Sequence, residues 1–196
     1  IGIAAGIYFA GADRSSEELS PVRFSFHLAE TSDLWSTRNY AAVAISRDGS
    51  TIGYAAQTSQ GGGQFLRPLS GRDFRSYVSG QWTYGPFFGP AGARMAYVVG
   101  GTRLEAVGAD GAGRVTLATF QTNANSGRWG PDGSIIVSLG EHGLVRVSPA
   151  SATQDTLTRP DSAAGEVAHE WPEFLPGGES LLFTIRYDDG SDSISV

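Results

Sequence analysis

Short apolar runs that end in tight turns recur along most of the chain. An Asp-Gly pair, or a variant of it, stands at each turn, and such a pair between two apolar runs is a strong signal for a β-hairpin. One apolar residue lies four positions before the turn glycine and another lies three positions after it. The turn glycines are Gly49, Gly92, Gly133 and Gly178, with Ile45, Phe88, Trp129 and Phe174 before them and Ile52, Met95, Ile136 and Leu181 after them.

The hairpins repeat at a nearly constant spacing. Consecutive turn glycines are 43, 41 and 45 residues apart, and most hairpins lead into a third and a fourth apolar run. Four strands in about 40–45 residues is the length of one β-propeller blade. A β-sandwich is the alternative, but it does not require a repeat of this length. The sequence therefore predicts an all-β fold, a β-propeller of four-stranded antiparallel blades at residues 32–78, 84–118, 127–158 and 171–196.

The two ends of the sequence add two further expectations. The last blade is expected to lack its outermost strand, so that about four blades form an incomplete arc. Residues 1–12 are almost wholly apolar, and charge begins at Asp13. We expect residues 1–12 to be a short helical segment at the end of a transmembrane helix, although a full span needs about 20 residues. A signal-peptide remnant or a buried helix or strand is the alternative. Residues 13–31 are expected to form a juxtamembrane linker and a first strand.

Several segments resemble a known family. The runs SRDGSTIGYAA at residues 46–56 and GPDGSIIVS at residues 130–138 resemble the TolB-like propeller repeat, whose core is S-P-D-G followed by an apolar strand. The wider pattern, from PVRFSFHLAE at residue 21 to HEWPEFLPGGESLLFTI at residue 169, is similar to that of bacterial membrane-bound serine/threonine protein kinases with a TolB-like sensor propeller. The chain departs from the repeat at Arg47, which replaces its Pro, and at Ala91 and Gly177, which replace its Asp.

The resemblance implies a function and a location. In that family a cytoplasmic kinase domain precedes one transmembrane helix, a short linker and a propeller outside the membrane. It implies that this segment is a non-catalytic sensor or protein-interaction module, anchored in the membrane through its N-terminal segment, with the propeller on the extracytoplasmic (periplasmic or extracellular) side. The alternatives are the propeller of a prolyl-oligopeptidase-type serine hydrolase and a periplasmic TolB-type adaptor. Kinase motifs upstream, or a G-x-S-x-G motif downstream, would distinguish the first two.

Composition narrows the chemistry. The net charge is -6 and all 14 cationic residues are Arg, so a nucleic-acid partner is not expected. The absence of Lys excludes a P-loop within these residues, and the absence of Cys excludes thiolate zinc sites and cysteine nucleophiles. The three histidines, His27, His142 and His169, lie far apart. We therefore expect no catalytic residue, no metal and no cofactor in this segment.

One face of the propeller is the expected binding surface. The links between blades, at residues 80–86, 119–127 and 159–170, emerge on the same side as the connections between second and third strands, while the Asp-Gly turns emerge on the other side. Loops held by a rigid scaffold carry many binding residues. We therefore expect a protein or small-molecule ligand on the side of the links, and the alternative is that these loops are merely solvated. The candidate residues, named here the blade-link residues, are Trp82, Tyr84, Asn123, Asn125, His169 and Glu170.

Overall fold

The computed structural model describes residues 33–34, 42–59, 61–71, 75–79 and 81–196. The expectations for residues 1–12 and for residues 13–31 lie outside the described residues. Within the described ranges, no helix is long and apolar enough to cross a membrane. The described residues do form one short helix, η1, which is a single 3-10 turn at Ser162–Ala164.

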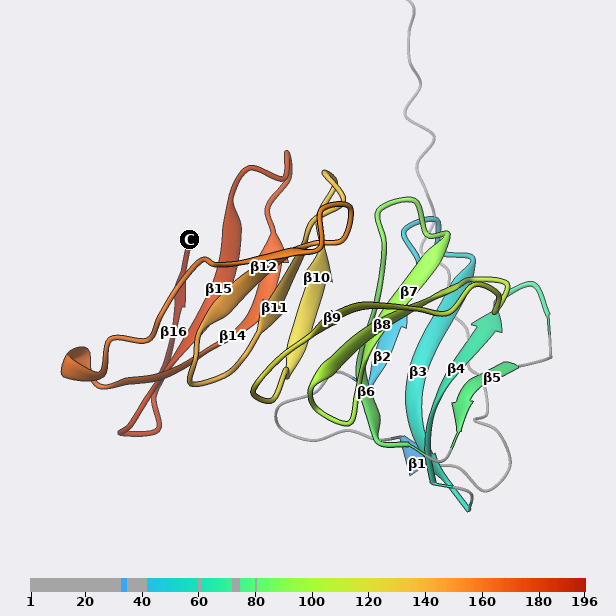
Figure 1. Ribbon diagram of the computed structural model, residues 1–196, viewed down its shortest axis with the longest axis horizontal. Coiled ribbons are helices and arrows are strands. Elements are labelled where there is room, and N and C mark those ends of the chain that lie inside the picture. Colours follow the sequence, from blue (N-terminus) through green and yellow to red (C-terminus); the bar gives the residue numbers. More distant parts are fainter. Residues whose placement is uncertain (1–32, 35–41, 60, 72–74, 80) are drawn as a thin grey trace, which may run out of the picture.

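Four antiparallel sheets follow one another in chain order (Figure 1). Sheet 1 contains β1 (Asp33–Leu34), β2 (Val43–Ile45), β3 (Thr51–Thr58), β4 (Gly61–Pro68) and β5 (Arg75–Ser79). Sheet 2 contains β6 (Thr83–Phe88), β7 (Arg94–Val99), β8 (Arg103–Gly108) and β9 (Val115–Thr119). Sheet 3 contains β10 (Ser126–Trp129), β11 (Ile135–Ser138), β12 (Leu144–Ser148) and β13 (Thr153–Thr156). Sheet 4 contains β14 (Glu166–Phe174), β15 (Leu181–Tyr187) and β16 (Asp192–Ser195).

The prediction of an all-β fold built from antiparallel blades is confirmed. Each strand pairs with the next strand of its sheet, and sheet 4 has three strands where sheets 2 and 3 have four. Sheet 1 differs at its inner edge, where the short strands β1 and β2 pair with different parts of β3. The backbone N–H of Ala55 also donates to the carbonyl of Ala42, which continues this edge between the two strands. The first strand of the first blade is therefore divided into two pieces.

The apolar cores lie between neighbouring sheets. Leu66 of sheet 1 belongs to one cluster with Met95 and Tyr97 of sheet 2. Leu104 of sheet 2 belongs to another with Ile135 and Val147 of sheet 3. A sheet with both faces covered buries side chains on either side of every strand, which is why β6 and β11 are buried along their whole length.

In sheets 2, 3 and 4, the residue four positions before the turn glycine packs against the preceding sheet. A Cβ built on Gly89 would lie 3.3 Å from the Trp129 ring, and one on Gly130 would lie 2.7 Å from Cζ of Phe174. Glycine therefore leaves room for the ring of the next blade, as expected where two backbones approach closely. The repeat seen in the sequence thus reflects one contact that is made between sheets 2 and 3 and again between sheets 3 and 4. Phe88 approaches sheet 1 at a different position of the repeat, where a Cβ built on Gly53 would lie 3.4 Å from its ring.

The Asp-Gly turns hold their carboxylates in hydrogen bonds. Asp48 Oδ1 accepts from Ser46 Oγ at 2.6 Å and from the backbone N–H of Ser50 at 3.0 Å. Asp132 accepts in the same way from the backbone N–H and hydroxyl of Ser134. These bonds favour the ionised carboxylate and lower the pKa of Asp48 to about 2, chiefly through the Ser46 hydroxyl, and lower that of Asp132 through Ser134.

The low pKa of Asp48 predicts a stability that depends on pH. Its ordinary value is 3.8, so the ionised turn stabilises the fold fully above about pH 4, and this contribution is lost as the pH falls through about 2. We expect Asp48→Asn to unfold at lower urea concentration than wild type at about pH 6, with a deficit that disappears toward about pH 2. Asp155→Asn is the control, because Asp155 is exposed on β13 and has no side-chain partner within the described part of the chain. An Asp48→Asn deficit that stays constant across this range would contradict the prediction.

Candidate functional site

Three of the blade-link residues lie in or beside contacts between sheets 3 and 4. Asn125 Nδ2 donates to Glu170 Oε1 at 3.3 Å, and Arg186 Nη1 donates to Glu170 Oε2 at 3.3 Å. His169 is buried, with Nδ1 2.7 Å from Thr158 Oγ1. The structure therefore brings Asn125 and Glu170 together at the interface between sheets 3 and 4. His169, which precedes Glu170 in the chain, is hydrogen-bonded at the same interface.

The imidazole of His169 is also fixed from its other side. Its Nε2 lies 3.1 Å from Glu166 Oε2, and the carbonyl of His169 accepts from Ser138 Oγ at 2.7 Å. The pKa of Glu166 is lowered, first by the backbone N–H of Asp161 and then by His169. Both ring nitrogens of His169 thus face internal partners, which favours a structural role for this residue.

The remaining blade-link residues lie near sheet 2. Tyr84 is buried in the core between sheets 2 and 3. A Cβ built on Gly101 would lie 2.5 Å from Asn123 Oδ1 and 2.9 Å from the Tyr84 hydroxyl, so these residues meet at Gly101. Trp82 is 61% exposed. A ligand role for the blade-link residues stays a prediction, and Trp82 offers the largest exposed side chain among them.

The connection between the second and third strands of the first blade is short, because β3 ends at Thr58 and β4 begins at Gly61. The glycines after this connection belong to β4, where Gly61 pairs with Thr58 and Gly62 with Gln57. A Cβ on Gly62 would lie 2.7 Å from the carbonyl oxygen of Gln81. These glycines therefore lengthen the pairing of β3 with β4 and allow β4 to approach the blade link closely.

We expect Glu170→Ala to test the structural role of this interface. Removing the carboxylate leaves Asn125 and Arg186 without their shared acceptor, so the free energy of unfolding should fall by about 1–3 kcal/mol. Trp82→Ala, at an exposed position, should change it by less than about 0.5 kcal/mol. Chemical denaturation of both variants measures the difference. Equal stability of Glu170→Ala and wild type would show that the hydrogen bonds do not hold the sheets together.

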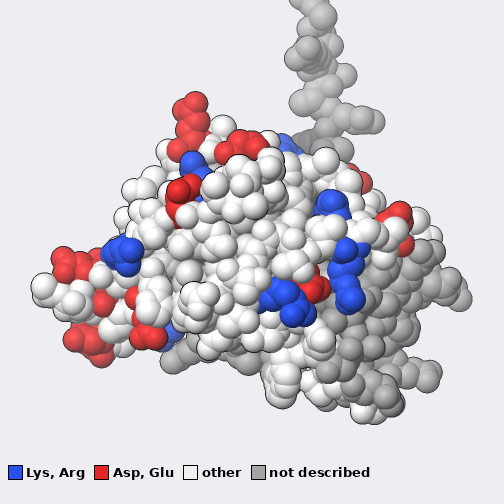
Figure 2. Space-filling model, in the orientation of Figure 1, with Lys and Arg blue, Asp and Glu red and all other residues white. Residues whose placement is uncertain are grey.

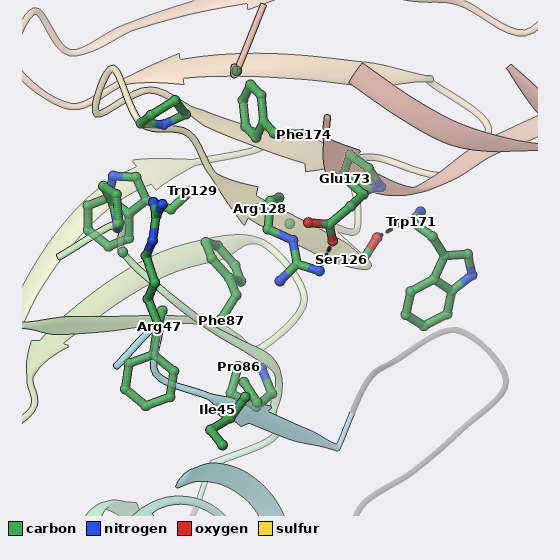
Figure 3. Close-up of a pocket in the computed structure, with 18 of the residues that line it drawn as sticks. Ile45, Arg47, Pro86, Phe87, Ser126, Arg128, Trp129, Trp171, Glu173 and Phe174 are labelled. Carbon is green, nitrogen blue, oxygen red and sulfur yellow. Dashed lines mark hydrogen bonds and ion pairs between the residues drawn. The ribbon is translucent and has the colours of Figure 1, made fainter. Parts of the chain in front are cut away.

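A cavity of about 970 Å³ lies on the opposite side of the arc, where the Asp-Gly turns emerge (Figure 3). The first strand of every blade contributes to it, through β2, β6, β10 and β14 and the turns that follow them. Its lining is largely aromatic and proline side chains, among them Phe87, Trp129 and Phe174. We name it the channel cavity, because it lies at the inner strands around the axis of the arc.

In two blades, a β-bulge that contains an X-Pro pair lines this cavity. Gly85-Pro86 interrupts the pairing of β6 with β7, and Trp171-Pro172 interrupts the pairing of β14 with β15. Gly85 and Trp171 occupy the same position of the repeat, seven residues before the turn glycine, and both have positive φ, at 63° and 54°. Glycine adopts such a conformation without strain, whereas a bulky residue is a genuine outlier that costs about 1–3 kcal/mol.

Three of the described residues that line the channel cavity are charged. Arg128 and Glu173 form an ion pair across sheets 3 and 4, and burial lowers the pKa of Arg128. Arg47 follows β2 and has no hydrogen-bond or ion-pair partner among the residues that the structure describes. The described part of the lining therefore carries one positive charge without an ion-pair partner, although the chain as a whole is acidic. On the face shown in Figure 2, acidic side chains gather at the end formed by sheet 4 and η1.

No protein-family model and no curated protein matches the chain. Solved structures do resemble it. A protein described as TolB from Agrobacterium tumefaciens has a TM-score of 0.54 at 16% identity, over 78% of this chain and 63% of its own. Oligogalacturonate lyase from Vibrio parahaemolyticus has a TM-score of 0.58 at 14% identity, over 81% and 52%. The Swd1 β-propeller domain of Myceliophteria thermophila has a TM-score of 0.58 at 12% identity, over 78% and 51%.

These similarities identify the fold as a β-propeller of the kind seen in TolB. At such low identity they show the fold alone, since unrelated functions share propeller folds. The chain spans between about half and about two thirds of the length of these structures. Within the part of the chain that the structure describes, no group of three His, Asp or Glu residues could hold a metal ion.

Proposed function

We propose that this chain is a non-catalytic binding propeller that holds its ligand in the channel cavity. The observation that carries the proposal is the convergence of the inner strands of all four sheets on one open cavity of about 970 Å³. Ligand sites in proteins are concave and mostly apolar, with a few polar groups that orient the ligand. The channel cavity has this composition, because aromatic and proline side chains surround Arg47 and the Arg128–Glu173 pair.

The chemistry of the lining favours binding over catalysis. Among the described lining residues, Ser126 carries the one side-chain hydroxyl, and its Oγ accepts from the backbone N–H of Trp171 at 3.2 Å. An activated nucleophile needs an adjacent base, and there is no histidine among the lining residues that the structure describes. The carboxylate of Glu173 is committed to Arg128. We therefore propose that this segment binds a ligand without transforming it.

A panel of probes tests the site without assuming the ligand. Blocked hexapeptides that are acidic, basic or neutral, together with small aromatic acids and amines, would be titrated against the chain by ligand-observed NMR. We expect at least one class to bind, and Ile45→Gln to weaken it at least fivefold, because Ile45 lines the cavity and is exposed. Ile194→Gln is the matched control, since Ile194 is exposed on β16 outside the cavity. Failure of every probe to bind, or loss of binding in Trp82→Ala alone, would contradict the proposal.

We further propose that the propeller is the extracytoplasmic sensor or protein-interaction module of a membrane-bound serine/threonine kinase. This part rests on the resemblance of the sequence, whose apolar segment, polar linker and blades follow that family's order. The flanking gene sequence tests it: H-R-D and D-F-G motifs upstream are expected. A downstream G-x-S-x-G motif would point instead to a prolyl-oligopeptidase-type hydrolase, and a cleavable signal without a kinase domain to a TolB-type adaptor.

A further inference from the structure

We infer that the channel cavity recognises an extended acidic peptide, with Trp171 as its apolar contact and Arg47 as its carboxylate contact. This inference rests on the proposed function and names the ligand of the same cavity. It comes from two features of the lining that the fold does not require. One is a tryptophan at a backbone position suited to glycine, and the other is an arginine without a partner within the described residues.

Neither the backbone conformation nor packing in the core explains why residue 171 is a tryptophan. The equivalent residue of the second blade is Gly85, which makes the same bulge before the same proline without a side chain. The Trp171 ring is only partly buried and belongs to none of the apolar clusters found among the described residues. A large amphipathic ring held on a rigid strand, in a lining that stays accessible, is a typical anchor for a partner.

Arg47 gives the cavity its charge preference. Arg128 is neutralised by Glu173, so within the described lining Arg47 is the cation that remains available to a ligand. A guanidinium matches a carboxylate with two parallel hydrogen bonds. In Figure 3, Arg47 and Trp171 lie on opposite sides of the Arg128–Glu173 pair. A ligand that touches both must therefore carry its carboxylate some distance from its apolar group.

The size of the cavity favours a peptide over a compact acid. Small-molecule sites span about 300–1,000 Å³, and about 970 Å³ lies at the upper end of that range. The lining also extends over all four blades, from Val43 to Gly178. A compact acid on Arg47 would leave most of the aromatic lining in water. An extended peptide covers it with successive side chains, as in other aromatic-lined peptide grooves.

Calorimetric titration of the chain with matched hexapeptides tests the inference. The first probe is a blocked hexapeptide in which Asp alternates with Phe, and the second replaces each Asp by Asn. We expect the acidic probe to bind at least tenfold more tightly than the amide probe. Arg47→Gln should abolish this preference and Arg47→Lys should restore part of it. Arg146→Gln, on β12 outside the cavity, should leave it unchanged.

Trp171→Gly separates binding from folding. Glycine fits the positive φ at this position, so the variant should keep a cooperative thermal transition while its affinity for the acidic probe falls at least tenfold. Trp171→Asn, which also tolerates this conformation, is the second variant and should behave in the same way. Equal affinity for the acidic and amide probes would overturn the inference, and so would retained affinity in both Trp171 variants. Benzoate represents a compact acid, and the inference is also overturned if benzoate binds as tightly as the acidic peptide. If basic or neutral probes bind in the cavity and acidic ones do not, the inference fails while the proposed function stands.

Discussion

Replacing Phe87 by alanine is expected to lower the free energy of unfolding by about 3–5 kcal/mol. Phe87 is 2% exposed and belongs to the core between sheets 2 and 3. A Cβ built on Gly127 would lie 2.8 Å from its ring, so the ring fits directly against the next blade. Truncation leaves a cavity at this contact, because the sheets cannot close around it without shifting.

Chemical denaturation measures this loss against a matched surface change. Val115→Ala, on β9, removes an apolar side chain that is 38% exposed and should cost less than about 1 kcal/mol. A Phe87→Ala variant as stable as Val115→Ala would show that the ring does not hold sheets 2 and 3 together.

Met95→Ala is expected to lower the free energy of unfolding by about 2–5 kcal/mol, and Gly53→Ala should partly restore it. Met95 is fully buried between sheets 1 and 2. A Cβ on Gly53 would lie 2.2 Å from its sulfur, so the two positions compete for the same space. Gly53→Ala alone should therefore destabilise the chain, whereas in the Met95→Ala background it fills the cavity.

A double-mutant cycle measures this coupling. We expect an interaction free energy of about 0.5–3 kcal/mol between the two substitutions, as is found for residues in contact. Additive effects, within about 0.5 kcal/mol, would mean that sheets 1 and 2 do not meet at this point.

The hairpins were predictable because turn chemistry is local. An Asp accepts the backbone N–H two residues later and glycine takes the positive φ, and both are seen at Asp48-Gly49 and Asp132-Gly133. The second blade was expected at residues 84–118, and its sheet spans residues 83–119. The apolar residues beside the turns lie in strands for the same reason, since pairing follows from the turn.

The contacts of the blade-link residues were not predictable from local pattern. His169 meets Thr158, and Glu170 meets Asn125 and Arg186, from segments up to 45 residues away in the chain. Nothing in the sequence next to these residues marks them as buried. A place on the ligand-binding face was therefore predicted for residues that the structure holds in hydrogen bonds between two sheets.

The bulges that line the channel cavity have a recognisable pattern in the sequence. Trp171-Pro172 and Gly85-Pro86 align at the same distance from their turn glycines, and two X-Pro pairs at one repeat position indicate a shared bulge in the inner strand. The positive φ of Trp171 could not be predicted, because local preference at that conformation favours glycine.

Hydrogen–deuterium exchange with and without a bound probe tests the location of the binding site most directly. The tightest probe of the panel would be added at saturation, and the change in amide exchange would be mapped along the chain. We predict slower exchange at residues 85–90, 126–131 and 171–178, which line the channel cavity. Slower exchange confined to the blade links, at residues 81–84, 119–125 and 159–170, would contradict this prediction. It would place the binding site on the opposite face.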